Sequence, residues 1–176
     1  MKRLLLISLL ITCAGCSSIP LSTMWEFRSF GTEEFLSLNP EDIMARVQLD
    51  EPTRADIEKT KLSLELSSER GVRSFDFPLV LLKEERLPAE SGLFSKTSAK
   101  KQYSFQLTEG ARKNFRLLQH EMLQHEPIHF HFNVQSSMES LPEDVDEIRL
   151  SLFLKLSEET DFIPMLRNAK LKVKRE

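Results

Sequence analysis

The sequence predicts a mainly β fold: an antiparallel β-sandwich of about seven strands with one α-helix near residues 109–124. Apolar and polar residues alternate with a period of two along most of the chain after residue 44, which is typical of strands with one buried face. Turn-forming residues separate these stretches near 69–71, 88–92 and 141–144. Only one long stretch has helical spacing instead, so helix is a minor component.

Seven stretches are expected to form the strands. In the third stretch, Val80, Leu81 and Leu82 break the alternation, which predicts a strand buried on both faces. Pro78 in the same stretch has no N–H to donate to a neighbouring strand, so it predicts an edge or a bulge. The stretches are Ala45–Leu49, Leu62–Leu66, Phe75–Leu82, Tyr103–Leu107, Ile128–Val134, Ile148–Leu156 and Ala169–Val173.

The helix is predicted from its cap and its apolar spacing. Thr108 is a good N-cap, Glu109 suits the positive end of the helix dipole, and Pro127 stops the helix. Two shorter helical turns are expected before the first strand, one capped by Thr32 and one by Asn39. The apolar residues that give the long helix its spacing are Ala111, Phe115, Leu118 and Met122.

Strands with one apolar face must cover that face. Two sheets packed as a sandwich do this economically, with the helix as a crossover or lid. The Cys…Trp…Cys set of true immunoglobulin domains is absent, so the topology is left as immunoglobulin-like or transthyretin-like. An open antiparallel sheet covered by the helix is the alternative. Residues 24–176 are expected to form a single domain.

The N-terminus combines three features. Lys2 and Arg3 are cationic, residues 4–12 are apolar apart from Ser and Thr, and Cys13-Ala14-Gly15-Cys16 follows. The apolar run is too short to cross a bilayer, which needs about 20 residues. The pattern resembles a bacterial lipoprotein precursor, although that family usually has Leu where this chain has Cys13. The resemblance implies a signal peptide over 1–15, acylation of Cys16 and a lipidated tether over 16–23. An ordinary signal peptide with an incidental cysteine is the alternative.

Cleavage before Cys16 changes the composition of the predicted mature chain. It removes Lys2 and Arg3, so 24 basic side chains become 22 against 27 acidic ones, a formal charge of −5. This acidity argues against a nucleic-acid partner. Ser17, rather than Asp, follows the modified cysteine, which in this family implies the outer membrane. The expected location is therefore the outer membrane, with the β-rich domain facing the periplasm and anchored through Cys16.

All four histidines lie between residues 120 and 131. Two of them, His129 and His131, are two residues apart on a predicted strand and therefore share one face, as half of a Zn or Cu site would. His120 and His125 are five residues apart, which places them on different sides of a helix and excludes the HExxH motif. The alternative is that these histidines lie on a solvent-exposed strand face, with the apolar side chains on the opposite face.

An apolar segment follows the tether. Trp25 and Phe27 are candidates for partner binding, because aromatic side chains often anchor protein interfaces. Packing of the same side chains into the core of the domain is the alternative.

The sequence contains no GxSxG, P-loop or GxGxxG motif. We therefore expect a non-enzymatic anchoring or scaffolding subunit of an envelope complex, with an envelope protein as partner and no cofactor. A periplasmic metal- or small-ligand-binding lipoprotein that uses the His120–His131 cluster is one alternative. The layout also resembles the small sandwich lipoprotein of type VI secretion complexes, through its lipobox, its size and Asn39-Pro40 before the first strand. No binding residue is implied by that likeness.

Overall fold

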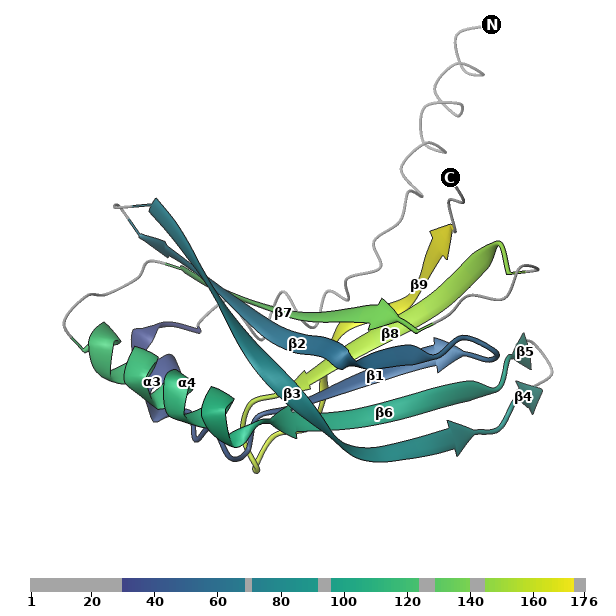
Figure 1. The fold of residues 1–176 in the computed structure, drawn as a ribbon, viewed down its shortest axis with the longest axis horizontal. Coiled ribbons are helices and arrows are strands. Elements are labelled where there is room, and N and C mark those ends of the chain that lie inside the picture. The colour runs from purple at the N-terminus through teal and green to yellow at the C-terminus, as the bar shows by residue number, and fades with distance from the viewer. Residues whose placement is uncertain (1–29, 69–70, 92–95, 124–128, 140–144, 173–176) are drawn as a thin grey trace, which may run out of the picture.

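The longest strand of the fold is β3 (Gly71–Leu87). The computed structural model describes residues 30–68, 71–91, 96–123, 129–139 and 145–172. β3 belongs to a seven-stranded sheet in the order β7-β2-β3-β6-β1-β8-β9, in which every pairing is antiparallel (Figure 1). The other strands of this sheet are β1 (Met44–Asp50), β2 (Ala55–Ser68), β6 (Lys100–Leu107), β7 (His129–Met138), β8 (Glu147–Lys155) and β9 (Ile163–Lys172).

Two short strands and two helices complete the described fold. β4 (Glu90–Ser91) and β5 (Lys96–Thr97) form a separate two-stranded ladder beyond the end of β3. The helices are α3 (Thr32–Ser37) and α4 (Glu109–Met122), and Figure 1 shows them together at one end of the sheet. Neither helix is long and apolar enough to cross a membrane, and this holds for all the described residues.

β3 changes its partner at Pro78. Residues 71–78 pair with β2, whereas residues 79–87 pair with β6. The Pro78 carbonyl accepts a hydrogen bond from the Thr108 N–H at 3.1 Å. Proline has no N–H to donate to a neighbouring strand, so the sheet tolerates Pro78 at the position where β3 changes from one partner strand to the other. The prediction of an edge or a bulge holds in part: each paired residue of β3 has a partner strand on one side only, and the bulge lies beyond Pro78, between Leu81 and Lys83.

The mainly β class, seven main strands and the helix near residues 109–124 are confirmed. An immunoglobulin-like or transthyretin-like sandwich is not confirmed, because β3 carries one continuous sheet from β7 to β9. The strand order agrees better with the alternative of a single antiparallel sheet covered by a helix. Side chains from both parts of the sheet nevertheless enter one buried cluster, among them Leu64 of β2 and Val47 of β1.

α4 packs its apolar side against the sheet. Thr108 accepts a hydrogen bond from the Ala111 N–H at 3.1 Å, as expected of an N-cap. The Phe115 ring lies 5.1 Å from the Phe35 ring and 5.2 Å from the Phe77 ring, measured between centroids. Burial of such a side chain contributes about 1.5–3 kcal/mol. The buried residues of α4 are the four predicted from the spacing: Ala111, Phe115, Leu118 and Met122.

α3 begins one residue earlier than expected. Gly31, and not Thr32, is the N-cap, and the Glu34 carboxylate accepts a hydrogen bond from the Gly31 N–H at 2.9 Å. The region after Asn39 is a turn rather than a second helix, with the Asp42 N–H donating to the Asn39 carbonyl at 3.0 Å. Phe35 is the buried residue of α3.

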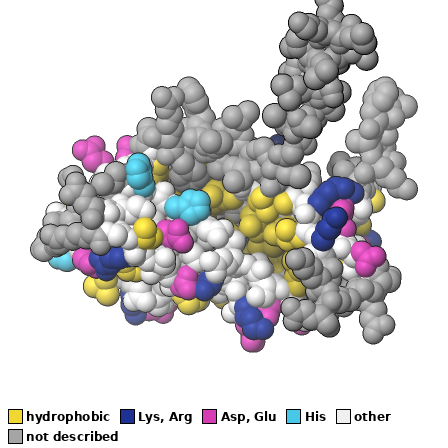
Figure 2. Space-filling view, turned by 90° about the horizontal axis from the view of Figure 1, so that it is seen from above, with side chains coloured by type: hydrophobic (Ala, Val, Ile, Leu, Met, Phe, Trp, Pro, Cys, Tyr) yellow, Lys and Arg dark blue, Asp and Glu magenta, His cyan; other side chains and the backbone are white. Residues whose placement is uncertain are grey.

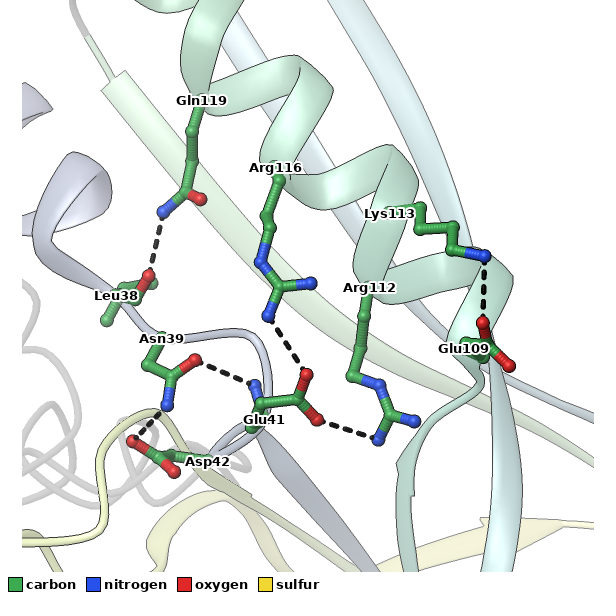
Figure 3. A network of polar contacts seen from close by, with 9 residues as sticks. All are labelled: Leu38, Asn39, Glu41, Asp42, Glu109, Arg112, Lys113, Arg116 and Gln119. Atoms are coloured by element: carbon green, nitrogen blue, oxygen red, sulfur yellow. Dashed lines mark hydrogen bonds and ion pairs between the residues drawn. The ribbon is translucent and has the colours of Figure 1, made fainter.

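Polar contacts fasten this N-terminal segment to α4 (Figure 3). The Glu41 carboxylate lies 3.0 Å from an Arg112 nitrogen and 2.9 Å from an Arg116 nitrogen. The Gln119 amide donates to the carbonyls of Phe35 and Leu38, each at 2.9 Å. The Gln119 amide thus gives the carbonyls at the end of α3 a side-chain donor, and the Phe35 carbonyl also accepts from the Leu38 N–H at 3.3 Å. These polar contacts hold the lead-in segment in place before β1 starts.

Candidate functional site

The predicted site residues fall into two groups. Cys16, Trp25 and Phe27 lie outside the described residues. His129 and His131 lie on β7, which is an edge strand, and both side chains are exposed. They share one face as expected, opposite the half-buried Phe130, and their neighbours across the ladder are Ser67 and Glu65 of β2.

The three histidines that the structure describes, His120, His129 and His131, have exposed side chains. Figure 2 shows histidine side chains toward one side of the molecule seen from above, with hydrophobic side chains gathered near its middle. Within the described ranges, no three His, Cys, Asp or Glu side chains come close enough to hold a metal ion. His125 lies outside those ranges, so the metal site stays a prediction.

A polar cleft of about 310 Å³ lies where the β1–β2 turn meets the start of β8. Two of its carboxylates are held in ion pairs. The Arg86 guanidinium donates to both oxygens of Glu51, at 2.8 and 2.9 Å, and this hydrogen bonding lowers the pKa of Glu51. Glu147 lies 3.2 Å from the Lys170 ammonium. A carboxylate with a lowered pKa is a poor proton donor near neutral pH, so this arrangement suits a structural role for Glu51.

The sheet face opposite the core carries polar side chains that are unusually enclosed; we call it the outer face. Gln102, Ser104 and Ser151 on this face are 7%, 7% and 3% exposed. The strand register arranges the outer-face side chains in three rows across β3, β6, β1 and β8. The rows are Val80–Gln106–Met44–Lys155, Lys83–Ser104–Arg46–Phe153 and Glu85–Gln102–Gln48–Ser151.

The row that contains Gln48 is saturated by its own hydrogen bonds. The Gln48 amide donates to Gln102 at 2.7 Å, and the Gln102 amide donates to Glu85 at 3.1 Å. At the other end of the row, the Ser151 hydroxyl accepts from the Asn168 N–H at 2.9 Å. These contacts leave this row little capacity for a further polar ligand.

The middle row differs, because its arginine has a side-chain nitrogen without a hydrogen-bond partner. The Arg46 guanidinium lies over the Phe162 ring, 3.7 Å from the ring centroid. Its Nε is buried and has no hydrogen-bond partner. Burial lowers the pKa of Arg46, and the negative charge of Glu85 opposes that shift. Arg46 forms no ion pair with any described carboxylate.

Exposed aliphatic side chains lie beside this row. Val80 is 42% exposed and Leu82 is 49% exposed. The prediction that Val80–Leu82 is buried on both faces was therefore wrong. The β-bulge between Leu81 and Lys83 puts the extra residue, Leu82, outside the core. We call Arg46, Val80, Leu82, Ser104, Phe153, Lys155 and Phe162 the outer-face patch.

Sequence reasoning did not find the outer-face patch. Arg46 alternates with the buried Ala45, Val47 and Leu49, so the sequence pattern is consistent with its facing away from the core. The missing information is the register between strands, since Ser104 and Phe153 become neighbours of Arg46 only after β1 pairs with β6 and β8.

Comparison of the chain with protein-family models, with curated proteins and with solved structures gave no match.

Proposed function

We propose that the chain is a lipid-anchored envelope protein, attached through Cys16 and acting as a non-enzymatic scaffolding or anchoring subunit. The observation that carries this proposal is the N-terminal order of a cationic start, a short apolar run and small residues directly before Cys16. Ser17 supports the outer membrane as the location and the periplasm as the side that the domain faces. Residues 24–176 then form the domain that the tether holds near the membrane.

The structure adds a surface suited to this role. The outer-face patch combines an arginine, aromatic side chains and exposed aliphatic ones, a composition typical of the central part of protein interfaces. An envelope protein is the partner we propose for it. The assignment to an immunoglobulin-like or transthyretin-like sandwich also stays a proposal, supported by the shared core of the two parts of the sheet.

The anchor is tested by substitution of each cysteine in turn. We expect the wild-type protein and the Cys13→Ala variant to take up a palmitate analogue and to sediment with membranes. The Cys16→Ala variant should do neither, because its thiol is the atom that would receive the lipid. Incorporation is read by in-gel fluorescence of cells fed an alkyne fatty acid. Label in Cys16→Ala, or its absence from the wild type, would contradict the proposal.

The scaffold role is tested in the native envelope. A C-terminally tagged protein is crosslinked gently in cells, purified, and analysed by quantitative mass spectrometry. A scaffolding subunit should bring down one envelope protein in a fixed ratio, whereas a tagged unrelated lipoprotein should not. Recovery of the monomer alone would remove the support for scaffolding and leave the anchor untouched.

A further inference from the structure

The outer-face patch carries two cations that form no ion pair within the described part of an acidic protein. The whole chain has a formal charge of −3. Lys83 in the patch row is neutralised by Glu85 at 2.6 Å. Arg46 and Lys155, in contrast, form no ion pair with another described residue. They are diagonal neighbours on one face of β1 and β8, a position that separates residues by about 7–8 Å.

The guanidinium of Arg46 is oriented before any ligand arrives. Its contact with the Phe162 ring, together with its position between Ser104 and Phe153, restricts the side chain. A planar fork of N–H groups fits the two oxygens of a carboxylate, and preorganisation reduces the entropy that binding costs.

The apolar part of the patch indicates what kind of molecule carries the carboxylate. Val80 and Leu82 lie along β3, across Ser104 and Gln106 from the Arg46 position. A molecule that contacts both must therefore extend across two strand spacings, about 10 Å. An anionic membrane fits less well, because two unpaired cations contribute only about 1 kcal/mol each toward such a surface.

We propose that the outer-face patch binds an acidic segment of a partner protein, with a Glu or Asp carboxylate on Arg46 and an aliphatic side chain on Leu82. This inference rests on the proposed function, since it names the surface and the chemistry of the partner contact. Lys155 provides the second positive charge for a neighbouring carboxylate.

The probe for this site is a capped pentapeptide of alternating glutamate and leucine, titrated into the full chain in mild detergent. Binding is followed by ¹H–¹⁵N NMR. We expect saturable shifts in the amides of residues 44–48, 80–83, 102–106 and 153–155. The Arg46→Met variant should bind about tenfold more weakly, because it loses a charge-assisted pair at the centre of the site. The Lys172→Met variant, which removes an equal charge from the exposed end of β9, should change the affinity less than about twofold.

A second variant keeps the inference testable if Arg46→Met does not fold. Leu82 is half exposed, so Leu82→Asp should fold and still repel the peptide. No saturable binding to the wild type, equal binding to Arg46→Met, or equal binding of the glutamine version of the peptide would overturn the inference. Binding of anionic vesicles with the same Arg46 dependence, without peptide binding, would overturn it in favour of a membrane contact. None of these outcomes alters Cys16 labelling or partner co-purification, so failure of the proposed function is separately visible.

Discussion

At the scale of single residues, Asp76 shows how an exposed position on the outer face is tied to its neighbours. Its carboxylate pairs with the Lys61 ammonium and accepts a hydrogen bond from the Ser63 hydroxyl at 2.6 Å. These two interactions, that with Lys61 first, lower the pKa of Asp76 below its ordinary value of 3.8. Its side chain is 51% exposed, so solvent screening keeps the contribution to stability small.

The lowered pKa of Asp76 gives a pH-dependent prediction. The ionised form is favoured in the folded state, so its stabilisation is complete above the ordinary pKa and is lost as the pH falls through the lowered one. Asp76→Asn should therefore be less stable than the wild type at pH 7, and the difference should shrink below pH of about 4. Urea denaturation at low ionic strength measures both proteins from pH 2 to 7. Lys61→Met should flatten the same pH region, and a difference that does not vary with pH would contradict the prediction.

Residue-scale prediction from sequence was good for the core and poor for the outer face. Apolar periodicity identified Leu64, Phe115 and Leu154, all of which are fully buried. Leu82 was misassigned because an unbroken apolar run looks the same whether a strand is buried on both faces or contains a bulge. A bulge is a property of two strands together, so a single stretch of sequence does not record it.

At the scale of elements, α4 depends on both its cap and its apolar side. The Thr108 side chain satisfies the Ala111 N–H, one of the N–H groups that have no partner inside the helix. The apolar side of α4 contributes the larger part of its stability, because short helices are marginal on propensity alone. The cap still matters, since it fixes where the chain leaves β6 and turns.

Substitution of Thr108 separates the hydroxyl from the methyl group. Thr108→Ala should lower the free energy of unfolding by about 1 kcal/mol, and Thr108→Ser should recover most of this, because serine keeps the oxygen that caps the helix. Chemical denaturation of the three proteins gives the values. If the serine and alanine variants are equally destabilised, the methyl contact and not the cap is the cause.

Element prediction worked where patterns were long. All seven strand stretches overlap a strand of the main sheet, and the helix begins at Glu109 as expected. The prediction of a short helix after Asn39 was wrong, because the Asn-Pro pair occurs in non-helical turns as well as at helix starts. In this turn the Asn39 side chain accepts a hydrogen bond from the Glu41 N–H at 3.3 Å. Local signals of this length do not distinguish the two outcomes.

At the scale of the whole molecule, the sheet was not predictable from the pattern. Seven strands that each have one apolar face can form either two packed sheets or one bent sheet. The choice depends on the 17-residue strand β3, which pairs with β2 along its first part and with β6 along its second. Periodicity shows which residues form β3 but carries no information about which strands pair with it.

The strand order predicts how protection is distributed across the sheet. β6 and β1 have a partner on each side, whereas β7 and β9 are edges. In hydrogen exchange of the full chain, the amides of β6 and β1 should be the slowest, with opening free energies near that of global unfolding, and the outward amides of β7 the fastest. Protection of β7 equal to that of β6 would contradict this expectation and would show that its edge is covered in solution.

The position of β1 has a consequence for how the chain is made. β1 is translated early, yet its two neighbours in the sheet are β6 and β8. The pair Gln48 and Gln102 alone is separated by 54 residues. The centre of the sheet is therefore completed only when β8, near the C-terminal end, becomes available. Until then β1 lacks one of its two partner strands, so the main sheet forms only after nearly the whole chain has been synthesised.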